Sequence, residues 1–175
     1  QADADLYAMQ LDVTVTGPYG TCFRREDRQG PLVLVGAGSG MSPIWSILND
    51  HLMSGEKRPV YFFYGARTRD DLFYLDRIAE LTRHHPDVTF IPVLSEPAAG
   101  DDWPGRTGFV HQAVLDDFGS LPRYQVYACG PPAMLEAVRG LCAERGVACE
   151  LALETPMACG FGACFGCAVP LAGGG

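Results

Sequence analysis

The chain has 175 residues, 47% of them hydrophobic, so it can form one complete domain with a sizeable core and a fragment of a second. Its 13 basic and 21 acidic residues give a net charge of −8, which argues against nucleic acid or an anionic membrane surface as a partner. No apolar run reaches the ~18 residues of a transmembrane helix, and the uneven spacing of the seven cysteines predicts a reducing, cytoplasmic location over a disulfide-bonded fold.

Residues 1–28 have the pattern expected for the end of a preceding domain. The stretch LDVTVTGPYG alternates apolar and polar residues before a Gly-Pro turn, so Asp12 to Thr16 is predicted to be a strand. The N-terminus does not begin with Met and lacks the pattern of a signal peptide. We therefore interpret residues 1–28 as a tail and linker that follow another part of the protein.

Short apolar runs then alternate with helical patterns. Strands are predicted at residues 31–35, 60–64, 88–94, 125–129 and 148–153. Helices are predicted from Pro43, with Ser42 as the N-cap, to Gly55; from Asp70 or Asp71 onward; near Gly108 to Phe118; and after Pro132. The residues expected to face the core are Ile44, Ile47, Leu48 and Leu52, then Leu72, Leu75 and Ala79, and finally Met134, Val138, Leu141 and Cys142. The alternation predicts an α/β fold, a doubly wound five-stranded parallel sheet over residues 29–153.

The loop after the first buried strand is rich in glycine and leads into a helix. Glycine lets a pyrophosphate approach the backbone, and a helix N-terminus supplies free N–H groups and positive potential. The pattern departs from G-x-G-x-x-G because residue 41 is Met, and an acidic residue is missing at the end of the second strand. A dinucleotide site and a simple tight turn are both compatible with this loop. The candidate ligand-binding residues here are Gly36, Gly38, Gly40, Ser42, Pro43, Gly65, Ala66 and Arg67.

A second candidate segment follows the fourth buried strand. That strand ends at Cys129, and Gly130 and Pro131 lead into the next helix. Ligands of such sheets bind at the carboxyl ends of the strands, where the strand order reverses. We therefore expect Cys129, Gly130 and Pro131 beside the glycine loop, although Cys129 can equally be a small buried core residue.

Three cysteines near the C-terminus form a C-x4-C-x2-C array. Cys159, Cys164 and Cys167 have the spacing that begins a plant-type [2Fe–2S] site, and the intervening glycines permit backbone N–H groups to turn toward the sulfurs. A fourth cysteine does not follow, and Cys149 is the nearest substitute in the sequence. A zinc site and three unligated thiols are the alternatives, but no second cysteine pair or nearby histidine supports zinc.

Five motifs occur in the order and spacing of a known family: GPYG, GAGSGMSP, YFFYGARTRDDLFYLDRI, GRTGFV and YACGPPAM. Over residues 12–145 the chain resembles the ferredoxin–NADP reductase superfamily, and most closely the NADH-dependent flavoprotein reductases of bacterial aromatic-ring and hydrocarbon oxygenases. The resemblance implies that residues 36–43 hold the pyrophosphate and residues 65–69 lie by the adenosine ribose. It also implies that Cys129 to Pro131 flank the nicotinamide near the flavin, with Cys129 as the catalytic residue.

The same resemblance bears on the cofactors. GPYG would close a flavin-binding barrel, and the Arg-x-Tyr-Ser flavin motif is absent from this sequence, so FAD is expected mainly on a preceding domain. Arg67 and Arg69 could pair with the 2′-phosphate of NADPH, stack on adenine or lie in solvent. The resemblance implies NADH.

The C-terminal segment has a resemblance of its own. The stretch ELALETPMACGFGACFGCAVPLAGGG resembles the cluster module of the electron-transfer subunit of bacterial dihydroorotate dehydrogenase, in which a fourth cysteine follows a short hairpin later. We therefore interpret residues 154–175 as an incomplete [2Fe–2S]-binding segment.

These features together predict a function. Nicotinamide gives up two electrons as a hydride, an iron–sulfur cluster accepts one at a time, and a flavin can join the two. The sequence thus predicts an NAD(P)H-dependent flavin and iron–sulfur reductase that passes electrons to a partner, either an oxygenase component or a dihydroorotate dehydrogenase catalytic subunit. The alternative is a non-catalytic nucleotide-binding module whose cysteines hold zinc or sense redox state.

Overall fold

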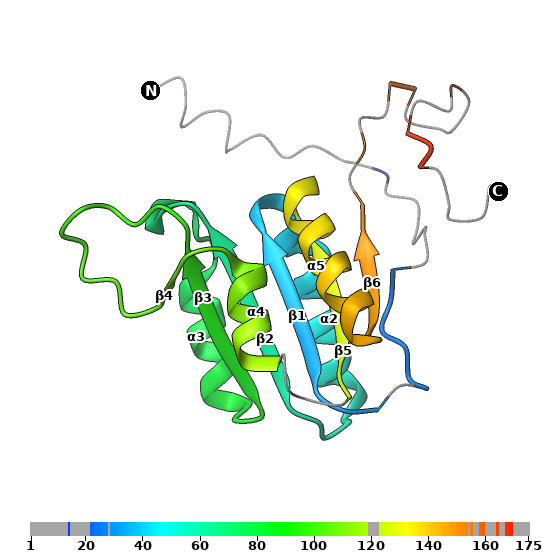
Figure 1. Ribbon diagram of the computed structural model, residues 1–175. Coiled ribbons are helices and arrows are strands. Elements are labelled where there is room, and N and C mark those ends of the chain that lie inside the picture. Colours follow the sequence, from blue (N-terminus) through cyan, green and yellow to red (C-terminus); the bar gives the residue numbers. More distant parts are fainter. Residues whose placement is uncertain are drawn as a thin grey trace.

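A single parallel sheet with helices on both faces forms the body of the protein (Figure 1). The computed structural model describes residues 14, 22–27, 29–118, 123–153, 155, 158–159, 164 and 167–169. Six strands lie in the order β4-β3-β2-β1-β5-β6. Their bounds are Leu32–Ala37 (β1), Val60–Ala66 (β2), Val88–Leu94 (β3), Arg106–Thr107 (β4), Gln125–Cys129 (β5) and Ala148–Ala152 (β6).

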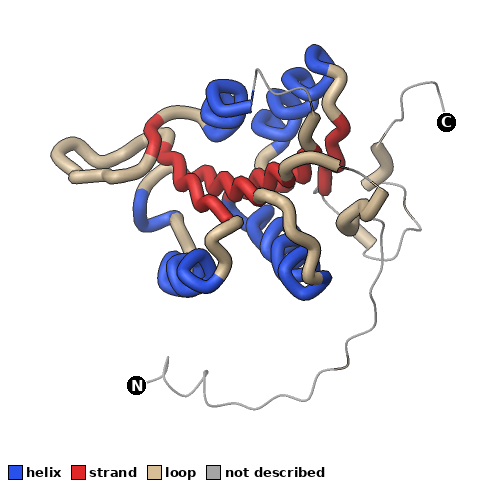
Figure 2. The backbone as a smooth tube through the Cα atoms, turned by 90° about the horizontal axis from the view of Figure 1, so that it is seen from below, coloured by secondary structure: helices blue, strands red, loops and turns tan. Residues whose placement is uncertain are grey.

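Four α-helices connect these strands. They are α2 (Met41–Ser54), α3 (Leu75–His84), α4 (Val110–Phe118) and α5 (Pro132–Arg145), and two short 3-10 helices are η1 (Gly38–Gly40) and η2 (Arg69–Asp71). Figure 2 shows the helices above and below the edge-on sheet. In the described part of the chain, no helix combines the length and apolar character needed to cross a bilayer.

The central strands bury both of their faces. In β1, Leu32 and Leu34 belong to the core cluster with α2 and α3, whereas Val33 and Val35 belong to the cluster with α4 and α5. All four side chains are completely buried. This is why the strand reads as a continuous apolar run and not as an alternating one.

The strand order reverses between β1 and β5. The chain moves outward from β1 through β2 and β3 to β4, and then returns to place β5 on the other side of β1. The predicted doubly wound parallel fold is therefore confirmed, and the crevice above β1 and β5 is the topological switch point where such sheets bind ligands.

Three details of the prediction are wrong. The sheet has six strands, because the two exposed residues of β4 pair with the end of β3. Ser42 is not an N-cap, since α2 begins at Met41 after a 3-10 turn and no side chain caps it. Helix α3 begins at Leu75, so Ile78 is buried and Ala79 is exposed.

The predicted strand from Asp12 to Thr16 lies outside the described residues, apart from Thr14.

Candidate functional site

Two loops meet at the switch point with their backbones in contact. In the sheet register, Gly36 of β1 lies opposite Cys129 of β5. A Cβ atom added to Gly40 would overlap the carbonyl group of Cys129, and one added to Gly130, whose φ is +158°, would lie 3.2 Å from the Ala37 Cβ atom at the end of β1. The loop after β1 and the loop after β5 therefore require glycine at these two positions in order to approach each other.

Gly38 differs from these two glycines because the space that a side chain would occupy there is open. Its φ is +55°, a left-handed conformation that favours glycine, and a Cβ atom there would meet nothing within 4 Å. Helix α2 begins three residues later with no side-chain cap. The Met41 N–H donates to the Gly38 and Ser39 carbonyl groups, so α2 continues from η1 and the positive end of this continuous turn lies at Gly38, where an anionic ligand group can approach it.

A cleft of about 630 Å³ opens above the carboxyl ends of β1, β2, β3 and β5. Ala37 and Gly38 contribute to its lining from the loop after β1, and Pro131 and Met134 from the start of α5. Most of the lining is apolar, with a few polar groups such as Arg67, Asp71 and Ser95. A mostly apolar cleft with few polar groups at a switch point is typical of a small-molecule or cofactor site.

The structure brings part of the predicted site into this cleft. The predicted residues that line it are Gly38, Gly65, Ala66, Arg67 and Pro131. Others lie outside the lining, as parts of the surrounding scaffold: Gly36, Gly40, Ser42, Pro43, Cys129 and Gly130. Gly65, near the end of β2, is closely packed, since a Cβ atom there would lie 3.0 Å from the Cβ atom of Val110 in α4.

Cys129 lies beneath the cleft. Its side chain is 1% exposed and belongs to the core cluster on the α2 and α3 face of the sheet. Its predicted catalytic role therefore stays a prediction, and the structure gives it the position of a packing residue whose backbone supports Gly40.

One end of the cleft carries a fixed negative charge. The Asp71 carboxylate accepts hydrogen bonds from the Thr68 backbone N–H (3.1 Å) and the Thr68 hydroxyl (3.0 Å), and the Arg67 Nε atom lies 3.9 Å away. The backbone bond, then the hydroxyl bond, and also the charge of Arg67 lower the pKa of Asp71. Asp71 is therefore ionised at neutral pH.

Two aromatic rings lie exposed at the cleft. Phe73 is 55% exposed and Phe109 is 66% exposed, and both line the cleft. The Phe109 ring stacks on His111 with 5.6 Å between the ring centroids and 15° between the planes. Exposed rings that border a cleft offer a surface for a flat ligand group.

Asp71, Phe73 and Phe109 were not predicted as site residues, for different reasons. Asp71 comes five residues after the end of β2 and could have been found only from its capping-box spacing with Thr68. Nothing in the sequence distinguishes Phe73 or Phe109 from core residues.

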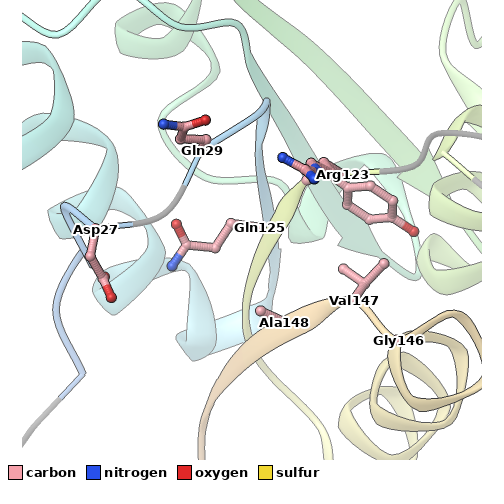
Figure 3. A pocket seen from close by; sticks show the side chains of 8 residues that line it. Asp27, Gln29, Arg123, Gln125, Gly146, Val147 and Ala148 are labelled. Atoms are coloured by element: carbon pink, nitrogen blue, oxygen red, sulfur yellow. The ribbon is translucent and has the colours of Figure 1, made fainter.

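A second cavity lies at the opposite end of the sheet (Figure 3). It measures about 350 Å³ and is bordered by Gln125 at the start of β5 and by Asp27 and Gln29 before β1. The buried Gln125 side chain donates a hydrogen bond to the Tyr127 hydroxyl (2.6 Å), which also accepts one from the Arg25 N–H (2.6 Å). These bonds tether the linker to the sheet, away from the switch point.

The three C-terminal cysteines are described, but they are not gathered into a site. Cys159 and Cys167 are half-buried, Cys164 is exposed, and the Thr155 hydroxyl donates to the Cys167 carbonyl group (3.2 Å). Among the described residues, no group of three or more His, Cys, Asp or Glu side chains is arranged to hold a metal ion. The donor types fit a [2Fe–2S] cluster and their present arrangement does not. The glycines between them lie outside the described residues.

Comparisons with known proteins agree with the fold. A family model described as the oxidoreductase NAD-binding domain matches residues 34–140. The chain is 41% identical over 133 residues to the reductase component of propane 2-monooxygenase from Mycolicibacterium goodii, covering 74% of this chain and 38% of that protein. It is 38% identical over 142 residues to the CDP-6-deoxy-L-threo-D-glycero-4-hexulose-3-dehydrase reductase of Yersinia pestis, covering 80% of this chain and 41% of that protein.

A solved structure is similar as well. The crystal structure of the Amycolatopsis cytochrome P450 reductase GcoB matches with a TM-score of 0.67 and 34% identity, over 77% of this chain and 42% of that one. The chain therefore spans less than half the length of these relatives.

Proposed function

Since the chain belongs to the oxidoreductase NAD-binding domain family, we propose that it binds NADH and holds the nicotinamide ring against an FAD carried by a flavin domain of the same protein. The cleft of about 630 Å³ at the β1/β5 switch point is the observation that carries this proposal. The cleft has a glycine-lined edge and a helix that begins behind it, which suit a pyrophosphate, and exposed aromatic rings at its border, which suit a flat ring.

Each part of the cleft suits one part of NADH. The pyrophosphate fits beside Gly38, where no side chain blocks the backbone and α2 begins. Phe73 and Phe109 offer their rings to the adenine, and Asp71 can accept hydrogen bonds from ribose hydroxyls. Pro131 and Met134 then border the space for the nicotinamide.

In this function the chain acts by positioning the nicotinamide ring relative to the flavin. FAD, when bound, supplies the change from two-electron to one-electron transfer. The residues that line the cleft hold the dinucleotide so that one face of its nicotinamide ring is turned toward the flavin. The apolar wall that Pro131 and Met134 form excludes water from that face. Cys129 and Gly130 support this wall from below through their contacts with Gly40 and Met134.

The electron acceptor is proposed to be an oxygenase-type partner protein. The relatives include the reductase component of propane 2-monooxygenase and the phenol hydroxylase P5 protein of Acinetobacter pittii. These names favour an oxygenase component over the dihydroorotate dehydrogenase subunit that the C-terminal resemblance suggests.

A [2Fe–2S] cluster on Cys159, Cys164 and Cys167 is part of the proposal, supported by their spacing alone. Iron and sulfide analysis of anaerobically purified protein, with its visible absorption spectrum, tests this assignment. Zinc in place of iron would support the nucleotide-binding module with a zinc site.

The dinucleotide site is tested with Gly38→Val. The valine side chain would project into the open space at the cleft and disfavour the left-handed backbone, so NADH affinity should fall about tenfold or more. Gly55→Val is the matched control because Gly55 also has a positive φ (+72°) and open space around it, but lies at the far end of α2. Equal affinities for NADH in the two variants, measured by titration calorimetry, would contradict the proposed site.

A further inference from the structure

Two cysteines outside the cleft lie against each other. Cys142 belongs to the last turn of α5, and Cys149 lies in β6. Their side chains are within hydrogen-bonding distance, and both pack against the core cluster under α4 and α5. The connection between them is fixed, since the Val147 N–H donates to the Cys142 carbonyl group (2.9 Å).

The two thiols differ in access to solvent. Cys142 is 1% exposed, whereas Cys149 is only half-buried. Strand β6 is at the edge of the sheet. Of the two cysteines, Cys149 is therefore the one that a small solute meets first, and Cys142 is its hydrogen-bonded neighbour on the core side.

The charges around the pair favour reaction at Cys149. The hydrogen bond to Cys149, followed by burial and the charge of Cys149, raises the pKa of Cys142, so Cys142 keeps its proton and acts as the donor in the pair. Arg139, one turn earlier in α5, lies within electrostatic range of the Cys149 sulfur. A neighbouring positive charge and a hydrogen-bond donor both stabilise a thiolate, which is the reactive form of cysteine.

We propose that Cys142 and Cys149 form an oxidation site that closes to a disulfide when the protein meets hydrogen peroxide. The Cys149 thiolate attacks one peroxide oxygen and the O–O bond breaks, which gives a sulfenic acid at Cys149 and a hydroxide ion; this ion takes up the proton that the Cys149 thiol released to solvent and leaves as water. The Cys142 sulfur then attacks the Cys149 sulfur. The S–S bond forms, the S–O bond breaks, and the Cys142 proton leaves with the oxygen as a second water, so two electrons have passed from the thiols to peroxide.

The first step prepares the second. A hydrogen bond to Cys149 and the charge of Cys149 hold the proton on Cys142. The charge effect ends when Cys149 becomes a neutral sulfenic acid, so the proton of Cys142 is then held less strongly. The product would join the end of α5 to the edge strand β6, whether or not a dinucleotide occupies the cleft.

Peptide mapping tests the proposal directly. The purified protein is treated with hydrogen peroxide, its remaining thiols are alkylated, and it is cleaved after glutamate without reduction. The cleavage places Cys142 on residues 137–144 and Cys149 on residues 145–150, apart from the peptides that carry Cys22, Cys129 and the C-terminal array. The expected product is these two peptides joined, lighter by two hydrogen atoms than their sum, and separated again by a reducing agent.

Two variants separate the steps, and Cys22 supplies a control. Cys142→Ser should stop the reaction at a Cys149 sulfenic acid that dimedone traps, and Cys149→Ser should leave Cys142 as a thiol. Cys22→Ser should leave the linkage intact, because the exposed Cys22 belongs to a different segment. Joining of the Cys149 peptide to residues 1–26, or full alkylation of both peptides while Cys22 is oxidised, would overturn the proposal.

Discussion

In the proposed dinucleotide site, Asp71 lies where it can affect the choice between NADH and NADPH. Its carboxylate lines the cleft, and its bonds to Thr68 keep it ionised at neutral pH. A ribose hydroxyl can donate to this carboxylate, whereas a 2′-phosphate would bring a second negative charge to the same place. The Arg67 side chain is 74% exposed and 3.9 Å from Asp71, so it offsets this repulsion only in part.

The substitution Asp71→Asn should therefore weaken the preference for NADH over NADPH. The asparagine oxygen can still accept bonds from Thr68, so the 3-10 turn is kept while the charge is lost. We expect the ratio of the two dissociation constants to shift toward NADPH by roughly tenfold. Asp70→Asn is the control, because Asp70 is exposed and does not line the cleft. If Asp71→Asn leaves the ratio of the two dissociation constants unchanged, the charge of Asp71 does not affect the choice between NADH and NADPH.

Sequence patterns could predict only part of the site. Gly38 and Pro131 were predicted because glycine loops and helix starts follow buried strands, and local sequence determines both. The exposure of Phe109 depends on how α4 packs beside β2 and β3 after the β4 turn. That packing involves residues far apart in the chain, so no local pattern contains it.

At the scale of elements, burial on both faces made the central strands predictable. β3 and β5 have the predicted bounds because each is a short, mostly apolar run that ends at a residue typical of a turn, Ser95 or Gly130. β4 was missed because two exposed residues carry no pattern, and they are a strand only through pairing with β3. Helix α3 begins later than predicted because the hydrogen bonds between Asp71 and Thr68 close a 3-10 turn before the helix.

The contact between the two switch-point loops can be tested with Gly40→Ala. The added methyl group would overlap the Cys129 carbonyl group, which is backbone and cannot move aside cheaply. We expect a loss of about 1–3 kcal/mol in the free energy of unfolding, measured with urea, and a loss of NADH binding. Gly140→Ala in α5 is the control, since its methyl group meets nothing within 4 Å and should be neutral or slightly stabilising. A Gly40→Ala variant with unchanged stability would show that the loops are not in contact.

At the scale of the whole molecule, the linker before β1 is held to the sheet by ionic and polar contacts. The buried Arg24 side chain bonds to Asp50 (2.9 Å) and Glu56 (2.6 Å) at the end of α2. Its neighbour Arg25 contacts Glu150 of β6 (3.3 Å). These contacts join segments far apart in the sequence, and Arg24 and Glu56 also lie close to a buried histidine, His51.

His51 should make the stability of the molecule sensitive to pH. Its side chain is completely buried, and neither ring nitrogen has a hydrogen-bond partner among the described residues. Burial chiefly lowers the pKa of His51; Arg24 and Arg58 lower it further, and Glu56 and Asp87 oppose them. Below the ordinary value of 6.5 the unfolded chain takes up a proton that the folded protein does not, so stability falls as the pH falls through this range.

His51→Gln removes the titrating group, so we expect the melting temperature to depend less on pH. Between about pH 7.5 and about pH 5.5, the variant should lose about 2–4 °C less than the original protein, although it is less stable at the higher pH because its packing is altered. His84→Gln is the control, because His84 is an exposed residue near the end of α3. Thermal unfolding followed by circular dichroism at the two pH values gives the comparison. If His51→Gln loses as much as His84→Gln, the acid sensitivity arises from groups other than this buried imidazole.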